Sequence, residues 1–229
     1  MTETATGAAN PITIREFLQT EGLEDWRATS DGALAFFRTS SFMESVELVR
    51  AIGDSIKGSG QQPDIDIRDD GVTARLITVH ESLYGLTYGD VELARKISAA
   101  AREHGLSADP SVLQSVLIVP GAPNIAEVVP FWQAVTGYQR RPDSPDEDLI
   151  DPHGRGPAFW FEQMEQPRSH EGGAIHLAVW MPFEQAEARV SAALAAGGHM
   201  VRDDFAPAWW TLADAAGNEA DIATPKHRD

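Results

Sequence analysis

The sequence predicts an α+β protein with two parts: a four-stranded antiparallel sheet with helices on one face, followed by a paired βαβββ module domain. Two observations lead to this prediction. Residues 11–106 carry helical and strand patterns in the order helix, two strands, helix, two strands, helix. Residues 111–225 contain an internal repeat, since segments 114–137 and 175–198 have equal length and the same plan.

Composition narrows the classes of partner. The chain has 229 residues, with 18 Lys and Arg against 35 Asp and Glu, which gives a formal charge of −17. Such a charge repels phosphate backbones and anionic membranes, so we expect neither nucleic acid nor membrane as a partner. The chain has no cysteine, which excludes disulfides and thiolate catalysis and fits a cytoplasmic protein. No apolar run approaches the ~20 residues of a membrane span, and residues 1–10 do not resemble a signal peptide.

The first three elements of the N-terminal part are short. Ile14, Phe17 and Leu18 recur at helical spacing, and Gly22 ends the pattern. Strands at 26–29 and 33–38 then flank a turn of the Asp-Gly type. A longer helix follows, in which the expected buried stripe consists of Phe42, Val46, Val49, Ile52 and Ile56.

A second hairpin gathers polar residues at one end. Strands at 65–67 and 72–79 are separated by the turn-forming residues 69–71. Asp90 can cap the last helix of this part. The polar residues around the hairpin are Gln61, Gln62, Pro63, Asp64, His80, Glu81, Thr87 and Asp90.

Residues 12–106 resemble the pterin-4a-carbinolamine dehydratases. The resemblance rests on the order and spacing of segments 22–26, 36–38, 63–64, 78–81 and 85–87, together with Phe42, Asp90 and the helix that starts 91–94. It implies a lyase that removes water from a 4a-hydroxytetrahydropterin and gives the quinonoid dihydropterin. It also implies that no metal or redox cofactor takes part.

The resemblance assigns roles to the polar residues, and the chain departs from the family pattern at two of them. The family carries a His-His pair before the proline and a third His on the neighbouring strand, which suits acid–base chemistry. His80 matches the third, but Gln61 and Gln62 replace the pair, and an amide neither takes nor gives a proton at neutral pH. Asp90 can orient a ligand or only cap its helix. The candidate catalytic residues are therefore His80, Gln61, Gln62 and Asp90, and the candidate substrate contacts are Pro63, Asp64, Glu81 and Thr87.

Each repeat of the C-terminal part predicts a strand, a helix and about three more strands. The later strands are expected at 148–151 and 158–163 in the first copy, and at 200–202, 209–213 and 219–223 in the second. One such module cannot bury its sheet alone, but two can pair and curve around a shared cavity. We expect residues 143–148, with His153 and Arg155, to form a solvated loop over one end of it.

The run 209–214, closed by 217–219, resembles the glyoxalase/bleomycin-resistance family, also called vicinal oxygen chelate proteins. Enzymes of this group hold a divalent metal with side chains from the first and last strands of each module. The corresponding positions here are Ser115, roughly Glu162, His176 and Asp221. Serine is a poor neutral ligand, so we predict no metal, and His176 can instead be a hydrogen-bonded strand residue that lines a pocket.

Tryptophans are concentrated in the same part. Trp160, Trp180, Trp209 and Trp210 fall on expected strands and Trp132 on a helix. Alternation places Trp209 and Trp210 on opposite faces, so at least one of them need not be core. An aromatic cavity suits a flat organic ligand, although plain core packing explains each tryptophan as well. The candidate ligand contacts of this part are His176, Trp160, Trp209, Glu162 and Asp221.

Three functions remain open. The chain is a pterin-dehydratase-type lyase, or a diverged relative that acts on another small cyclic substrate, fused to a glyoxalase-like binding domain. Alternatively it binds or sequesters a small molecule with weak or no catalysis, or it is a metal-dependent enzyme in its C-terminal part. Gln61 and Gln62 favour a binder or a changed substrate, and Ser115 argues against the metal enzyme. Sheet edges and both resemblances suggest a homo-oligomer.

Overall fold

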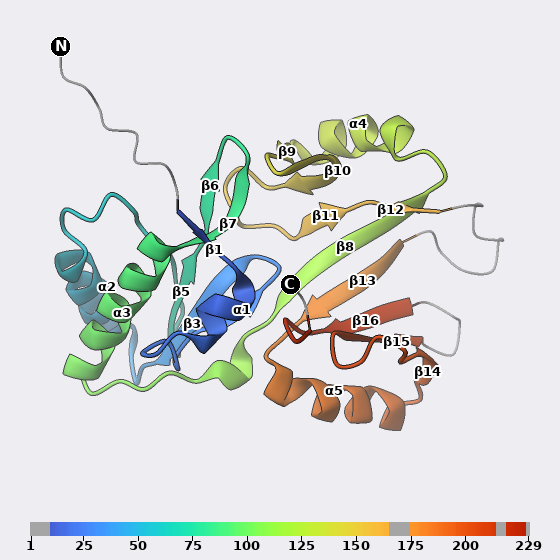
Figure 1. Ribbon diagram of the computed structural model, residues 1–229. Coiled ribbons are helices and arrows are strands. Elements are labelled where there is room, and N and C mark those ends of the chain that lie inside the picture. Colours follow the sequence, from blue (N-terminus) through green and yellow to red (C-terminus); the bar gives the residue numbers. More distant parts are fainter. Residues whose placement is uncertain (1–9, 165–174, 214–218, 228–229) are drawn as a thin grey trace, which may run out of the picture. The chain divides into compact units, whose positions relative to one another are not determined.

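The computed structural model describes residues 10–164, 175–213 and 219–227. It divides into two compact units: unit 1 is Met1–Trp26 with Gly32–Asp109, and unit 2 is Arg27–Asp31 with Pro110–Asp229. Helices and strands are mixed in both, which confirms the predicted α+β class (Figure 1). Among the described residues, no helix is both long enough and apolar enough to cross a membrane.

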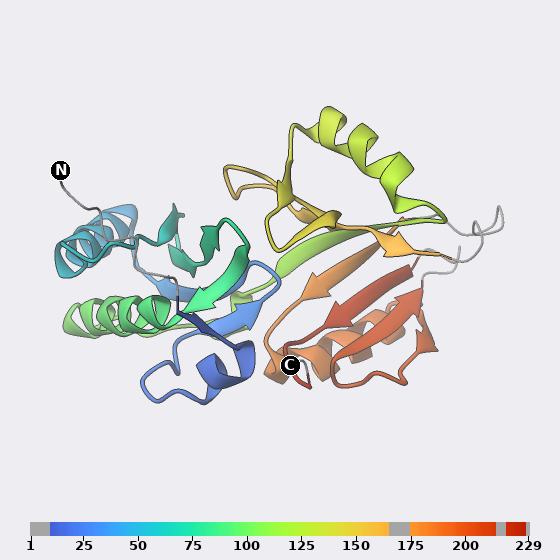
Figure 2. The ribbon, with the colours of Figure 1, turned by 45° about the horizontal axis from the view of Figure 1, so that its top comes forward.

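A four-stranded sheet has the order β2-β3-β5-β4, as predicted, and three of its strands, β3, β4 and β5, belong to unit 1. Its strands are β2 (Arg27–Thr29), β3 (Gly32–Arg38), β4 (Asp64–Ile67) and β5 (Gly71–Leu76). The β3–β5 and β4–β5 ladders are antiparallel. Helices α2 (Phe42–Ser55) and α3 (Tyr88–Glu103) lie side by side, and α2 packs on β4 and β5 (Figures 1 and 2). The largest fully buried side chains here are Trp26, Phe17, Phe37, Leu48, Ile52, Leu76, Leu93 and Ile97.

A second, three-stranded sheet in unit 1 was not predicted. The chain leaves the four-stranded sheet after Leu76, so the expected single strand 72–79 is in fact β5 and a separate β6 (Thr78–His80). Strand β6 forms a hairpin with β7 (Leu83–Thr87), and β7 also pairs with β1 (Pro11–Ile12). The first helix, α1 (Ile14–Gln19), therefore begins later than Pro11, with Thr13 as its cap. This small sheet carries His80 away from the ladder that holds β5.

The buried face of α2 differs from the predicted stripe. The helix buries Ser45, Leu48 and Ile52, whereas Phe42 is 57% and Val46 37% exposed. Ser45 is tolerated in the core because its hydroxyl is hydrogen-bonded to that of Thr39 at 2.7 Å. A pattern that counts only apolar side chains cannot include Ser45, so the predicted stripe wrongly contained Phe42 and Val46, while Ile52 is buried as predicted. Val49 and Ile56 are partly buried against the core.

Unit 2 confirms the repeat. The first module is β8 (Ser115–Ala122), α4 (Ile125–Thr136), β9 (Gln139–Arg141), β10 (Ser144–Ile150), β11 (Ala158–Trp160) and β12 (Glu162–Gln163). The second is β13 (Ile175–Trp180), α5 (Phe183–Ala195), β14 (His199–Arg202), β15 (Trp209–Ala213) and β16 (Glu219–Ala223). The turn expected between the last two strands falls in 214–218, outside the described residues.

The register shows the symmetry of the repeat directly. Strands β8 and β13 pair antiparallel at the centre of a nine-stranded sheet, in the order β14-β15-β16-β13-β8-β11-β10-β9 with β12 beside β8. Ser115 pairs with Trp180 and Val119 pairs with His176. Exchanging the two repeats therefore leaves the central ladder unchanged.

The two faces of this sheet differ. On one face, α4 covers a cluster around Phe159 and Phe161, and α5 covers a cluster around Met181 and Ile222. Because side chains alternate along a strand, the neighbours of these core residues point to the other face of the sheet. We call that other face the helix-free face. Its cluster consists of Val119, Ala178, Trp180 and Ala223, with Leu117 and Trp209 packed against it. The acidic segment 143–148, predicted to be a loop, lies mostly in β10.

Candidate functional site

Four polar side chains meet at the N-terminal end of α3 in unit 1. The Nε2 of Gln61 donates to Thr78 Oγ1 at 2.9 Å and to Thr87 Oγ1 at 3.0 Å, and it lies 3.4 Å from Asp90 Oδ1. The Gln61 amide therefore joins the loop before β4 to β6, β7 and α3. Its N–H groups are fully used by partners inside the protein.

Asp90 is the centre of this cluster. Its Oδ2 accepts three hydrogen bonds of 2.8 Å, from the Thr78 hydroxyl and from the backbone N–H and hydroxyl of Thr87. The helix cap itself is Thr87, and Asp90 is its reciprocal partner three residues on, so the expectation that Asp90 occupies the cap position was wrong by three residues. Asp90 is only 3% exposed, which is tolerable for a carboxylate because these donors replace water.

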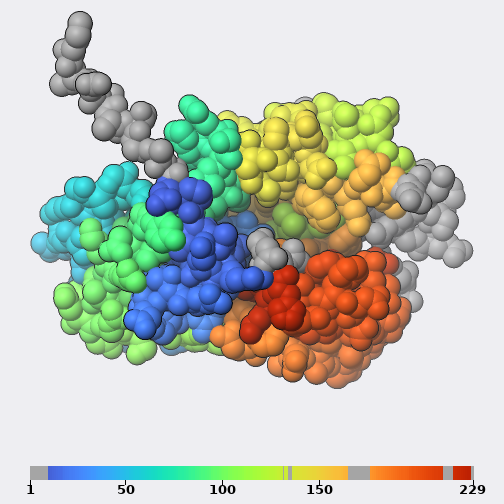
Figure 3. Space-filling view, in the orientation of Figure 1, coloured from blue at the N-terminus to red at the C-terminus, as the bar shows by residue number. Residues whose placement is uncertain are grey.

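His80 lies farther out on the same structural element. It ends β6 opposite Leu83, two residues beyond Thr78. Alternate strand residues share a face, so His80 stands on the side of Thr78, roughly 7 Å farther along the strand. The hairpin reaches the surface of unit 1 (Figure 3, blue-green), and the exposed His80 imidazole bonds to no side chain that the structure describes. Glu81 is exposed in the turn beyond it.

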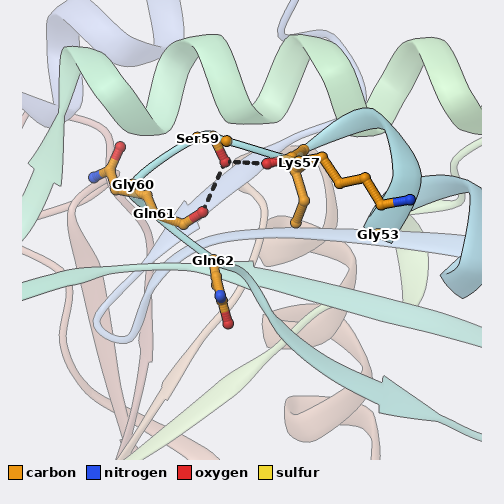
Figure 4. A pocket seen from close by; sticks show the side chains of 8 residues that line it. Gly53, Lys57, Ser59, Gly60, Gln61 and Gln62 are labelled. Atoms are coloured by element: carbon orange, nitrogen blue, oxygen red, sulfur yellow. Dashed lines mark hydrogen bonds between the residues drawn. The ribbon is translucent and has the colours of Figure 1, made fainter.

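A hollow of about 610 Å³ opens between the end of α2 and β4. Gln61 and Gln62 both line it, but their side chains leave the loop in different directions (Figure 4). Lys57 brings a positive charge to the rim, and its hydrogen bond to Asp54 raises its pKa. The other lining residues are Gly53, Ile56, Gly58, Ser59 and Gly60.

The remaining candidates of unit 1 are less available to a ligand. Pro63 is half-buried at the start of β4. Asp64 is held by Arg75, whose Nη2 lies 2.6 Å from the carboxylate. Thr87 is 3% exposed and serves the helix cap. Gln62, His80 and Glu81 are thus exposed candidates of unit 1, and Asp64, although exposed, is paired with Arg75.

A second cluster of the same kind lies on the helix-free face of unit 2. The Thr211 hydroxyl donates to Asp221 Oδ1 at 2.7 Å across the β15–β16 ladder. The other carboxylate oxygen of Asp221 lies 3.4 Å from His176 Nε2. The His176 side chain is 9% exposed and that of Asp221 is 17% exposed. The predicted proximity of His176 and Asp221 is thus present, with Thr211 as a partner that the sequence did not suggest.

The predicted place of Glu162 in this cluster was wrong. Asp221 pairs with Ala178, and the matching parallel pair in the first module is Leu117 with Ala158. Ala158, not Glu162, is therefore the counterpart of Asp221, because the register is set by the central ladder and not by the end of the strand. Glu162 pairs with Gly121, four residues farther along β8 than Leu117, which is roughly 13 Å away.

The donor set does not fit a divalent metal. Of the four positions, Ser115 is a buried hydroxyl and Ala158 supplies no ligand, which leaves His176 and Asp221. Throughout the described ranges, no group of three or more His, Cys, Asp or Glu side chains is placed to hold an ion. We therefore assign no metal-dependent step to unit 2.

Aromatic and acidic side chains flank the cluster. Trp209 belongs to the helix-free face and Trp210 packs under α5, so the predicted division of this pair is confirmed. Trp160 is 39% exposed and pairs across the strands with Asp148, a buried carboxylate that the sequence did not single out. Burial raises the pKa of Asp148, while the Ser144 hydroxyl and Arg141, at 3.1 Å, partly oppose that effect. Its alternation with the core residue Leu149 could have indicated its orientation.

Known protein families match the two parts of the chain separately. Residues 9–100 match the family model described as pterin 4 alpha carbinolamine dehydratase, and residues 117–223 match the glyoxalase-like domain. A protein of Nocardia farcinica named for pterin-4-alpha-carbinolamine dehydratase is 37% identical over 82 residues, which is 36% of this chain and 84% of that protein. A protein of Mycobacterium avium with the same name is 36% identical over 77 residues, 33% of this chain and 79% of that protein.

Solved structures resemble each half. A transcriptional coactivator/pterin dehydratase from Brucella melitensis is 21% identical and covers 40% of this chain and 99% of its own, with a TM-score of 0.33. A member of the glyoxalase/bleomycin resistance protein/dioxygenase superfamily from Vibrio splendidus is 15% identical and covers 49% of this chain and 99% of its own, also with a TM-score of 0.33.

Proposed function

The chain belongs to the pterin-4-alpha-carbinolamine dehydratase family through residues 9–100, joined to a glyoxalase-like domain, and from this premise we propose that unit 1 is a pterin-type binding site with slow dehydration at best. The ligand is a small cyclic molecule held between the Gln61–Gln62 loop and the His80 strand. The observation that carries this proposal is the Gln61 amide, which donates to Thr78 and Thr87 where the family pattern has a proton carrier.

The chemistry requires two proton transfers. Loss of a 4a-hydroxyl as water needs one proton on the departing oxygen and the removal of one proton from a ring nitrogen. His80 carries an exposed imidazole and can make one of these transfers, with solvent making the other. Gln61 and Gln62 can only hydrogen-bond. Because general acid–base help is typically ~10²–10⁴-fold, the loss of two carriers leaves binding intact and slows the reaction strongly.

Binding and turnover test this proposal separately. Titration with 7,8-dihydrobiopterin should give saturable binding, and Gln62→Ala should weaken it. Generation of the 4a-hydroxy substrate in situ should show little acceleration over the solvent reaction, with the residual rate lost in His80→Ala. No saturable binding would refute the site. Turnover that His80→Ala leaves unchanged would refute the role of His80.

A second binding function, in unit 2, is favoured by the His176–Asp221–Thr211 cluster. Asp221 is held by Thr211 and in turn orients His176, while Trp209 contributes an aromatic surface on the same face. We propose that this face binds a flat organic ligand through ring contacts and the imidazole. A thermal-shift screen of flat aromatic metabolites should yield a stabilising compound whose effect is lost in His176→Ala. A hit whose effect survives that substitution would place its binding elsewhere.

A further inference from the structure

Gly89 makes room for the Gln61 side chain. It occupies the first turn of α3, between the cap Thr87 and its partner Asp90. A Cβ at Gly89 would overlap Gln61 Oε1 and would lie 2.8 Å from Gln61 Cδ. Glycine is a poor helix residue compared with alanine, so its presence at this position needs a reason. The reason is the Gln61 amide, which lies where the Cβ of any other residue would be.

Contacts on two sides therefore fix the amide. Thr78, Thr87 and Asp90 contact its nitrogen, and its oxygen occupies the space that a Cβ at Gly89 would take. We infer that Gln61 is a positioning residue, that Gly89 is its required counterpart, and that this Gln61–Gly89 lock holds the loop 58–62 in place. This inference rests on the proposed function only in what it says about the ligand.

The loop has little else to hold it. It contains two glycines, and Gly58 has a φ of +79°. The Ser59 hydroxyl reaches only the nearby carbonyls of Ile56 and Gln61, at 2.7 and 2.9 Å. Within the part of the chain that the structure describes, Gln61 provides the side-chain hydrogen bonds from this loop to β6, β7 and α3. Glycine-rich backbone is flexible, so the lock sets the position of the whole loop.

Gln62 gains its role from this arrangement. It is exposed, lines the hollow, and points away from Gln61 (Figure 4). An amide presents one acceptor and two donors, which complements a cyclic amide or aminopyrimidine edge such as that of a pterin. Gln62 is thus the residue of the pair that contacts the ligand, and Gln61 fixes the position of the loop that carries it.

A double-mutant cycle tests the lock without a ligand. Gln61→Ala should lower the Tm. Gly89→Ala leaves residue 61 unaltered but displaces its flexible amide, so in the wild-type background the loss of the amide's hydrogen bonds should offset the helix preference of alanine. The double variant should be no less stable than Gln61→Ala, because the added methyl then meets no amide and favours the helix. Gly53→Ala, inside α2 with no atom within 4 Å of the new Cβ, is the matched control and should not lower the Tm in either background. An effect of Gly89→Ala on the Tm that is the same in both backgrounds would overturn the lock.

Hydrogen exchange in the loop 58–62 and ligand affinity give a second test of the Gln61–Gly89 lock. Amide hydrogen exchange at residues 59–62 should accelerate by about fivefold or more in either single variant, as expected for the loss of one net hydrogen bond. The dissociation constant for 7,8-dihydrobiopterin should rise equally in Gln61→Ala, Gly89→Ala and the double variant. Unchanged exchange in Gly89→Ala would contradict the lock. If the wild-type protein binds no dihydrobiopterin, the proposed function fails, while the Tm cycle and the exchange still decide the lock.

Discussion

The polar clusters of the two units are built on the same plan but differ in one member. In unit 1, threonine hydroxyls hold Asp90, and Asp90 meets the Gln61 amide. In unit 2, the Thr211 hydroxyl holds Asp221, and Asp221 meets the His176 imidazole. The supporting carboxylate and hydroxyl are common to both, whereas the third group is an amide in one and an imidazole in the other.

The shared carboxylate and hydroxyl position the third group, and the identity of that group decides whether the cluster can transfer a proton. A buried carboxylate with satisfied oxygens can orient a neighbour whatever that neighbour is. Only an imidazole can then exchange a proton near neutral pH. Under the proposed function, unit 1 retains the scaffold of a dehydratase site and uses it to hold a loop. Unit 2 keeps an oriented imidazole on a sheet face whose described residues lack the other donors a metal would need.

The largest expected effect on stability is that of Asp90→Ala. It leaves the two threonine hydroxyls and the Thr87 N–H without their acceptor in a site that is 3% exposed, and it removes half of the capping box. We expect unit 1 to lose about 3 kcal/mol, because bonds to charged groups contribute ~1.5–3 kcal/mol each and their loss is partly relieved by relaxation. Hydrogen exchange of the slowest amides in unit 1 measures this loss. Asp90→Asn, which keeps the acceptor oxygen, should cost clearly less.

Asp221→Ala sharpens the comparison with a smaller effect. Asp221 accepts one hydroxyl bond and one contact from His176, and its side chain is 17% exposed. We expect a loss of about 1 kcal/mol, confined to the slow amides of unit 2. A loss as large as that of Asp90→Ala would mean that the two carboxylates support their clusters equally, contrary to the difference in burial and in the number of donors.

Sequence reasoning succeeded where the pattern was global. The repeat at 114–137 and 175–198 predicted two equal modules, and the β8–β13 register agrees with it. The four-stranded sheet followed from alternation and from the Asp-Gly turn at residue 31. The opposite placement of Trp209 and Trp210 followed from alternation alone. These features depend on periodicity, which the sequence displays directly.

It failed where a neighbour outside the stretch that was read decides. Ser45 is core because Thr39 bonds it, and Gly89 is glycine because Gln61 lies on it. Glu162 was misplaced because the ladder, not strand spacing, sets which residue matches Asp221. The break at Ile77 depends on β7, which draws β6 into another sheet. These partners lie outside the stretch whose pattern was read, so that pattern does not reveal them.

Asp148 gives the smallest expected effect, visible as a pH dependence in unit 2. Burial raises the pKa of this carboxyl, against the opposing contacts of Ser144 and Arg141 and with Asp143 and Glu147 nearby. Its neutral form is therefore favoured in the folded state. That contribution is fully present below the unfolded pKa of about 4 and is lost as the pH rises through the folded pKa.

Asp148→Asn cannot ionise, so it should make the stability of unit 2 less dependent on pH. Relative to the wild type, the variant should gain stability as the pH rises from about 4 to neutrality. Urea unfolding at several pH values, followed through the exchange of amides in unit 2, measures the difference. A variant that instead loses stability relative to the wild type over this range would show that the Arg141 pair outweighs burial.

The most direct test of the central claim is the dehydration rate of Gln61→His with Gln62→His beside that of the wild type. The claim is that unit 1 retains a dehydratase scaffold and lacks its proton carriers. Asp90, Thr78 and Thr87 stand ready to orient an imidazole at position 61, so we expect kcat to rise about a hundredfold, at the low end of general acid–base help. Gln61→Ala with Gln62→Ala is the control and should give no rise. A wild-type rate already equal to that of the double-histidine variant would contradict the claim.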